Sequence, residues 1–529
     1  MLKDRESQLK MEIQHRQASL EDVQSALFNT INKANEIQNL LAPVSRLPNE
    51  VLLLIFEEVV SAQNGGKPAD RPERVVSLVS RRWRDVAIHS PSLWRRIWIM
   101  PGFTPAILDM YKTRASSRTL DIEVRDWREK KDIQRFDAAL EMMLEASTRW
   151  RSLSVFHTCE TYLNHLSAKL SRIRQFSVLE HFSFRAQRPG QTCTIPFHKS
   201  NETSAPFLKF LDAENFPLSG DLHDIRSGAI QNLSRLASLT LRRYNNNTRI
   251  MIDPNAFRAM IGAIPNLTSL ALHGQPLRFR NDSSLLDGVD APPPPPITLP
   301  HLHTLILLPS IFKPRYLHKT LSLLSAPTLR HFELVFPDSK ISGQNIVNFL
   351  FFDHHPMTTT TTTTKRPKFP LVHTLVLHNV ASASTAMAFV HAFPAASNVS
   401  IGGVDVGFFL PVLRAPGVVG DGYYDCSSAS APLPLHVRES SPHASWHNLR
   451  TLTLRSIRPD TLRIMRDWIR DEWERGRMPP ALVVKARQAD RGPDLTEFCQ
   501  CVRMYTRVDV VYVDRDVPPL LPPPPPHTG

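Results

Sequence analysis

Apolar and polar positions follow a regular pattern over the first 42 residues. Apolar side chains recur with a 3.5-residue period, and no glycine or proline interrupts the segment before Pro43. When Glu6 is taken as a heptad a position, only Glu6, Arg16 and Thr30 among the a and d positions are polar. The apolar a and d residues are Leu2, Leu9, Ile13, Leu20, Val23, Leu27, Ala34, Ile37 and Leu41. This period predicts one long helix over residues 1–42 with a coiled-coil seam. The seam either pairs with a second copy of the chain or docks along its own protein.

A different pattern begins at residue 43. Pro48 and Glu50 suit the first turn of a helix, because proline has the required φ and an acidic side chain interacts well with the helix N-terminus. Residues 51–56 are then apolar on every side. A helix that is hydrophobic all round has to be buried all round, which a segment of about 55 residues cannot achieve alone. We therefore expect part of this helix to meet another protein.

The rest of this segment, to residue 100, predicts one further helix. Residues 61–70 (SAQNGGKPAD) read as a polar loop, since glycines and a proline interrupt the helix. Three- and four-residue steps then relate the apolar residues Val75, Val76, Val79, Trp83, Val86 and Ala87. They predict one amphipathic helix, with Arg82 and its neighbouring arginines on the solvent side. Ser90 and Pro91 end that helix, and two tryptophans close the segment.

Three motifs of residues 43–100 resemble the F-box family in order and spacing. They are LPNEVLLLIF at 47–56, VSLVSRRWR at 76–84 and SPSLW at 90–94, and together they lie in about a tenth of the chain. Ser80 stands where the family often has cysteine, and the loop at 61–70 is longer than in its shortest members. The resemblance implies a small all-α module that binds the Skp-type adaptor of a cullin–RING ubiquitin ligase (the SCF complex). The adaptor-binding residues that it implies, divided between the core and the adaptor face, are Leu47, Pro48, Val51, Leu52, Ile55, Phe56, Leu78, Val79, Trp83, Leu93 and Trp94.

A short phrase recurs over residues 115–515: apolar, two variable residues, apolar, one variable residue, apolar. Clean copies begin at Leu236, Leu267, Leu302 and Leu449. Further variants begin at residues 150, 179, 208, 329, 372 and 396. Neighbouring early copies are about 28 to 31 residues apart, near the leucine-rich-repeat period. Each phrase predicts a short strand with two inward side chains, and the intervals supply the return segments. Stacking such units gives an α/β solenoid with one continuous core.

This array departs from a regular leucine-rich-repeat pattern. The asparagine that usually follows the last leucine of a repeat is absent, so we interpret the array as degenerate. A compact α/β domain with several such strands by chance is the alternative. Inserts at residues 290–297, 356–368 and 415–446 have low complexity and cannot bury a core. Residues 459–475 predict a last helix, residues 482–484 and 508–513 predict two last strands, and residues 516–529 form a proline-rich tail. The predicted fold class is thus mixed α and α/β.

Composition limits the function classes. The 529 residues are 42% hydrophobic and 21% charged, which is typical of globular proteins. No apolar stretch approaches the ~18–20 residues that cross a membrane, and the start has no signal-peptide h-region. The five cysteines are odd in number and contain no C-x-x-C pair, which favours a reducing compartment. We expect a cytoplasmic or nuclear protein with no membrane partner.

Basic residues concentrate beside the F-box-like motifs. The net charge is +13, and residues 71–118 hold ten Lys or Arg against three Asp or Glu. Such a balance can indicate nucleic acid. Aromatic stacking platforms are not evident beside these arginines, so a solvated basic face on a protein-interaction module is the favoured interpretation.

Motifs for catalysis are absent from the sequence. It contains no G-x-x-x-x-G-K-[ST], H-E-x-x-H or G-x-S-x-G, and no G-x-G-x-x-G follows a strand. His354 and His355 are adjacent, so their side chains diverge, and Cys499-x-Cys501 lacks partners at zinc spacing. We therefore expect no catalytic residue, metal or cofactor.

Together these patterns predict a non-catalytic substrate receptor of an SCF-type ligase. The module would bind the adaptor of the cullin complex, and the array would hold a protein substrate that the sequence does not identify. Two alternatives remain. One is a scaffold whose F-box no longer reaches a cullin, and the other, least favoured, is a basic nucleic-acid-binding protein.

Overall fold

The fold is that of a computed structural model of the 529-residue chain. It describes residues 2–62, 71–128, 132–186, 205–214, 233–243, 252–279, 295–309, 313–335, 347, 350–353, 366–380, 383–402, 409, 449–455, 459–476, 478–487 and 493–513. The histidine pair, the tail, the insert at 415–446, residues 63–70 of the loop, and residues 290–294 and 356–365 of the other inserts lie outside them. The chain divides into two units. Unit 1 is Met1–Trp98 with Gly102–Ile122, and unit 2 is Ile99–Pro101 with Glu123–Gly529.

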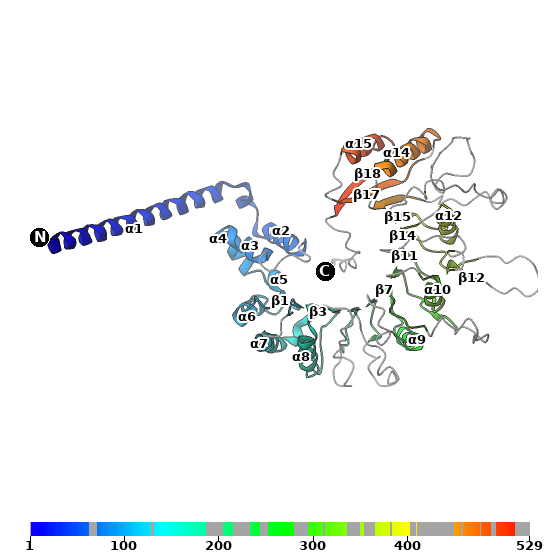
Figure 1. The fold of residues 1–529 in the computed structure, drawn as a ribbon, viewed down its shortest axis with the longest axis horizontal. Coiled ribbons are helices and arrows are strands. Elements are labelled where there is room, and N and C mark those ends of the chain that lie inside the picture. Colours follow the sequence, from blue (N-terminus) through cyan, green and yellow to red (C-terminus); the bar gives the residue numbers. More distant parts are fainter. Residues whose placement is uncertain are drawn as a thin grey trace, which may run out of the picture. The chain divides into compact units, whose positions relative to one another are not determined.

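Unit 1 opens with the predicted long helix. Helix α1 runs from Leu2 to Leu41, which confirms a helix over this segment (Figure 1). Every apolar a and d residue of the seam is exposed, and the exposed fraction of the large ones runs from 54% at Leu9 to 88% at Leu2. Its role as a coiled coil stays a prediction.

Short helices follow α1 in unit 1. They are the 3-10 turn η1 (Pro43–Arg46), α2 (Asn49–Ala62), α3 (Pro72–Val79), α4 (Arg81–Ile88), α5 (Pro91–Trp94) and α6 (Pro105–Arg114). The prediction of one helix from Val75 to Ala87 is wrong. Ser80 is extended, with φ −155° and ψ 167°, and its hydroxyl accepts from the Trp83 amide at 3.2 Å. Serine is a preferred N-cap, so it ends α3 and begins α4.

Strands β1 (Arg96–Ile99) and β2 (Leu120–Arg125) contain residues of both units. Over the described residues the main sheet has fourteen strands in the order β1-β2-β3-β4-β5-β6-β7-β9-β11-β14-β15-β16-β17-β18. From β3 onward the remaining strands of this sheet are β3 (Trp150–Thr158), β4 (His181–Ala186), β5 (Phe210–Glu214), β6 (Ser238–Arg243), β7 (Ser269–Gly274), β9 (Thr304–Leu308), β11 (His331–Leu334), β14 (Thr374–His378), β15 (Asn398–Gly402), β16 (Thr451–Arg455), β17 (Ala481–Arg487) and β18 (Val508–Val513). Neighbours from β3 to β18 are parallel. Two small ladders pair β8 (Ile297–Thr298) with β10 (Leu324–Ser325) and β12 (Phe352–Asp353) with β13 (Arg366–Pro367).

The register of the parallel strands aligns the repeated phrase. The middle apolar residues of successive phrases pair with one another from Leu153 in β3 to Leu452 in β16, and the row continues to Leu482 and Val508. These paired residues are at most 7% exposed. The predicted strands are therefore present with their inward side chains in one row. Their classification as leucine-rich repeats stays a prediction.

Helices return the chain between several of these strands. They are α7 (Ile133–Leu144), α8 (Glu160–Leu170), α9 (Pro254–Gly262), α10 (Pro314–Ser322), α12 (Ala383–Ala392), α14 (Pro459–Glu474) and α15 (Pro493–Val502), with the 3-10 turn η4 (Ser147–Arg149). Within unit 2 the labelled helices lie on one side of the strands (Figure 1). Among the described helices, none has both the length and the apolar character needed to span a bilayer.

Candidate protein-interaction surface

Helix α2 has a buried face and an exposed face, both apolar. Leu52 and Phe56 are fully buried, whereas Val51 is 37% and Ile55 41% exposed. The Phe56 ring packs against Trp83 of α4, with ring centroids 4.9 Å apart. α2 also packs against α3 and α5. The helix that the sequence predicts to be apolar on every side therefore serves the core with one face and leaves the other to solvent.

Helix α3 shows the same division. Val76 is buried, whereas Val75, Leu78 and Val79 are 52%, 73% and 50% exposed. The exposed apolar residues of α2 and α3, with Pro48 directly before α2, form a set that we call the α2–α3 apolar surface: Pro48, Val51, Leu54, Ile55, Val59, Val75, Leu78 and Val79. Leu54, Val59 and Val75 are not among the site residues predicted from the sequence. Their three- and four-residue spacing from Val51, Ile55, Leu78 and Val79 could have identified them in the sequence.

The remaining predicted site residues lie in or near the core. Leu93 is 2% exposed and Trp94 is fully buried. The Trp94 indole N–H donates to the Ala87 carbonyl at 2.7 Å, which fixes α5 against α4. Leu47 and Trp83 are half-buried.

Arg82 joins the second motif to the first. Its guanidinium donates to the carbonyls of Ser45 and Leu47, and its Nε and Nη2 donate to Asn49 Oδ1 at 3.1 and 2.8 Å. The sequence pattern placed Arg82 on the solvent side, but the side chain is half-buried and holds the start of α2.

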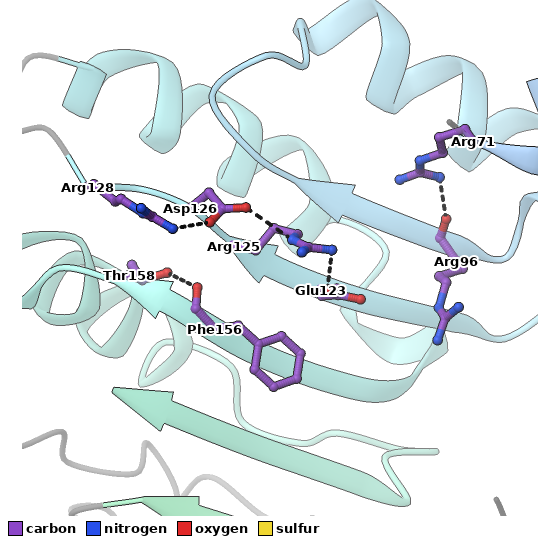
Figure 2. Close-up of polar contacts among 8 residues, drawn as sticks. All are labelled: Arg71, Arg96, Glu123, Arg125, Asp126, Arg128, Phe156 and Thr158. Atoms are coloured by element: carbon purple, nitrogen blue, oxygen red, sulfur yellow. Dashed lines mark hydrogen bonds and ion pairs between the residues drawn. The ribbon is translucent and has the colours of Figure 1, made fainter. Parts of the chain in front are cut away.

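A buried ionic network forms at the N-terminal end of α3. Arg71 is only 2% exposed, so the expected solvated basic face is wrong for this residue. Its Nη1 donates to Glu73 Oε1 at 2.8 Å and to the Arg96 carbonyl at 3.0 Å, the second of which Figure 2 shows. The guanidinium carbon lies 4.1 Å from the centroid of the Trp98 ring, a cation–π geometry.

Tyr111 of α6 completes this network. Its hydroxyl donates to Glu73 Oε1 at 2.7 Å. Burial raises the pKa of Tyr111 well above its usual range, with the Glu73 carboxylate adding to the rise and the Arg71 charge opposing it. The phenol therefore stays a neutral donor, and Glu73 accepts from two buried partners. Sequence reasoning missed all three groups, because periodicity does not show which charged residues meet in the interior.

Polar side chains line the sheet of unit 2 on the face opposite the buried row. Asp212 accepts from Arg185 Nη2 at 3.1 Å and from Arg242 Nε at 2.7 Å, and Arg242 Nη1 lies 3.1 Å from His273 Nδ1. His273 is only 6% exposed. Burial, with the charge of Arg242, lowers the pKa of His273 to about 3, so the imidazole is neutral at physiological pH. Near the first strands, Arg125 pairs with Glu123 at 3.1 Å and with Asp126 at 3.2 Å (Figure 2).

A second group of charges lies on the same sheet face. Glu333 of β11 is 3% exposed. The pKa of Lys485 in β17 is lowered by burial and by the charge of Arg455, while Glu333 acts in the opposite direction. A Cβ atom at Gly402 would lie 2.7 Å from the His378 ring, so glycine is what lets this ring cross the strand. This face thus presents fixed charges and polar groups.

Possible metal ligands do not cluster in the described part of the chain. No group of three or more His, Cys, Asp or Glu residues is placed there to hold an ion. Cys499 and Cys501 are free thiols on α15, and burial raises the pKa of Cys499. A raised pKa keeps that thiol protonated and unreactive.

Comparison with known families identifies one domain of the chain. Residues 44–100 match the family described as F-box-like, and the chain therefore contains an F-box-like domain at these residues. This confirms the F-box-like part of the resemblance and indicates a role in protein interaction. No curated protein matches the chain.

Proposed function

We propose that this chain is the substrate-recognition subunit of an SCF-type cullin–RING ubiquitin ligase. The F-box-like domain would bind the Skp-type adaptor, and unit 2 would hold a protein substrate. The observation that carries the proposal is the α2–α3 apolar surface. Exposed apolar side chains on two helices that contact each other are typical of protein-binding sites.

Within this function the chain supplies geometry and makes no bond itself. Holding a substrate lysine near a ubiquitin-charged enzyme raises the effective concentration of the two reactants. No catalytic residue, cofactor or metal is required of the receptor. We interpret unit 2 as a degenerate leucine-rich-repeat solenoid, because its strands are parallel, follow the chain in order and share one register. Stacked repeats provide an extended binding surface.

The substrate would contact the polar face of this sheet. His181 and Phe210 stack there with ring centroids 4.3 Å apart and planes 2° apart, and both stay half-buried. Four residues further along the same strand, Arg185 is 31% exposed at its side chain. A platform of this kind suits a protein segment that offers an aromatic or carboxylate group.

Co-precipitation in cells tests the assignment. The full chain should recover both adaptor and cullin, and a Leu47→Ala, Pro48→Ala double variant should recover less of both. A partner found by proximity labelling should accumulate when the cullin is inhibited. Undiminished recovery with the double variant would overturn the assignment.

A scaffold role is the second candidate, and the long exposed helix α1 favours it. Recovery of the adaptor without cullin, and no turnover of a bound partner, would support the scaffold over the ligase receptor.

Nucleic-acid binding ranks lowest, because burial of Arg71 removes one charge from the basic stretch. Its test is a steep loss of affinity for arbitrary DNA or RNA as salt rises.

A further inference from the structure

We propose that two copies of the chain pair through α1 as an antiparallel coiled coil. This inference does not rest on the ligase function. The helix has 40 residues and would be about 60 Å long at 1.5 Å per residue. Helices in proteins draw most of their stability from packing an apolar face, and the apolar seam of α1 is exposed along its whole length.

The repeat of the seam selects the kind of partner. Apolar residues spaced at 3.5 positions follow a straight line only when two helices supercoil around each other. A second copy of α1 offers the same repeat over the same length. The charges on the helix then decide how the two copies are oriented.

Parallel pairing places like charges together. In a parallel dimer each a or d residue faces its own copy, so Arg16 would meet Arg16 and Glu6 would meet Glu6 in core layers. At the edges, Arg5 of one helix would face Lys10 of the other, in two symmetric places. Like-charge contacts of this kind are destabilising.

Antiparallel pairing over the full helix removes these conflicts. Core a positions then face d positions, so Arg16 lies opposite Leu27 and Glu6 lies opposite Ile37. The aliphatic stem of a long polar side chain packs against an apolar neighbour while its charge reaches water. At the edges, Glu12 faces Lys33 of the other copy, in two symmetric places. The charge pattern is thus complementary to itself only in the antiparallel orientation.

The orientation has a consequence for the F-box-like domain. In an antiparallel pair the C-terminal ends of the two α1 helices lie at opposite ends of the coiled coil, roughly 60 Å apart. The next element, η1, begins at Pro43, directly after the helix. Two adaptor-binding domains would therefore emerge from opposite ends, whereas a parallel dimer would bring them to the same end.

Charge-reversal variants of the full chain test both the pairing of the two α1 helices and their orientation. We would measure the dimer dissociation constant by sedimentation equilibrium for the wild type, Glu12→Lys, Lys33→Glu and the double variant. We expect a wild-type dimer, a roughly tenfold weaker dimer for each single variant, and recovery in the double variant. In a parallel dimer Glu12 would face Gln17 and Lys33 would face Gln38. Neither charge reversal would then change a contact between the chains.

Two controls make the outcome decisive. Glu12 also pairs with Arg16 of its own helix at 2.6 Å, so equal weakening by Lys33→Glu shows that the effect lies between chains. Lys10 pairs with Glu6 of its own helix at 2.7 Å, so Lys10→Glu should not tighten an antiparallel dimer, whereas it should tighten a parallel one. A monomeric wild type, single variants without effect, failure of the double variant to recover, or tightening by Lys10→Glu would each overturn the proposal.

Discussion

The guanidinium of Arg82 donates a hydrogen bond to the backbone carbonyl of Leu47, 35 residues earlier in the chain. This bond ties the arginine-rich helix α4 to the leucine-proline segment that opens α2. Two motifs that are separate in sequence therefore form one structural unit. Arg82 thus fixes the backbone at Ser45 and Leu47, directly before the exposed residues Pro48 and Val51.

Replacing Arg82 with alanine should loosen the start of α2. The carbonyls of Ser45 and Leu47 would lose their donor, and hydrogen bonds to a charged group each contribute about 1.5–3 kcal/mol. Amide hydrogen exchange over residues 45–56 should become faster, and adaptor affinity should fall. Arg81→Ala is the matched control, because Arg81 is 86% exposed and its pair with Glu36 is a surface contact. Equal effects of the two variants would contradict the role of Arg82.

Loss of the Glu73 carboxylate should lower the free energy of unfolding more than loss of the Tyr111 hydroxyl, which donates to that carboxylate. Glu73→Ala leaves the buried Arg71 without its counter-charge, which costs about 3–5 kcal/mol. Tyr111→Phe removes one donor and should cost about 1 kcal/mol. Urea unfolding of the full chain, followed by tryptophan fluorescence, compares the two variants. A Tyr111→Phe effect as large as that of Glu73→Ala would contradict the network as described.

Neutral His273 should make unit 2 sensitive to acid. Its folded pKa of about 3 lies below the ordinary value of 6.5, so protons bind the unfolded chain more readily. The stability that this group contributes is present above pH 6.5 and is lost as pH falls towards 3. His273→Gln should therefore reduce the loss of stability over this window. Identical acid profiles of wild type and variant, measured by thermal unfolding, would contradict the assignment.

The α2–α3 apolar surface should tolerate a charge without loss of fold. Leu78 is 73% exposed, so Leu78→Asp should leave the unfolding temperature nearly unchanged. Adaptor affinity should fall at least about tenfold, as expected when an apolar contact residue becomes charged. Leu371→Asp is a matched control, since Leu371 is 49% exposed in unit 2. If both variants bind the adaptor equally, Leu78 lies outside the interface.

Local periodicity predicted many of the helices and strands but not which of them pack together. The recurring apolar phrase located the strands of the main sheet from β3 to β16, because each of these strands has two inward apolar side chains at a fixed spacing. The break at Ser80 was missed because apolar spacing continues across it from Val79 to Trp83. The extended backbone of Ser80, whose hydroxyl caps α4, separates the two helices there.

Burial of charged residues could not be read from the sequence. Arg71 and Arg82 belong to the same basic stretch as the exposed Arg81, and nothing local distinguishes them. Their positions depend on the cation–π contact of Arg71 with Tyr111 and the hydrogen bond of Arg82 to Ser45, partners that are distant in the chain. The division of α2 into a core face and an exposed face likewise required the positions of α3, α4 and α5.

Direct titration of the purified full chain with a purified Skp-type adaptor tests the central claim. We expect saturable one-to-one binding by calorimetry, weakened by at least about tenfold in the Leu47→Ala, Pro48→Ala variant. Retention of the wild-type unfolding profile by that variant would assign the loss to the interface. No saturable binding by the wild type, or equal binding by the variant, would contradict the account.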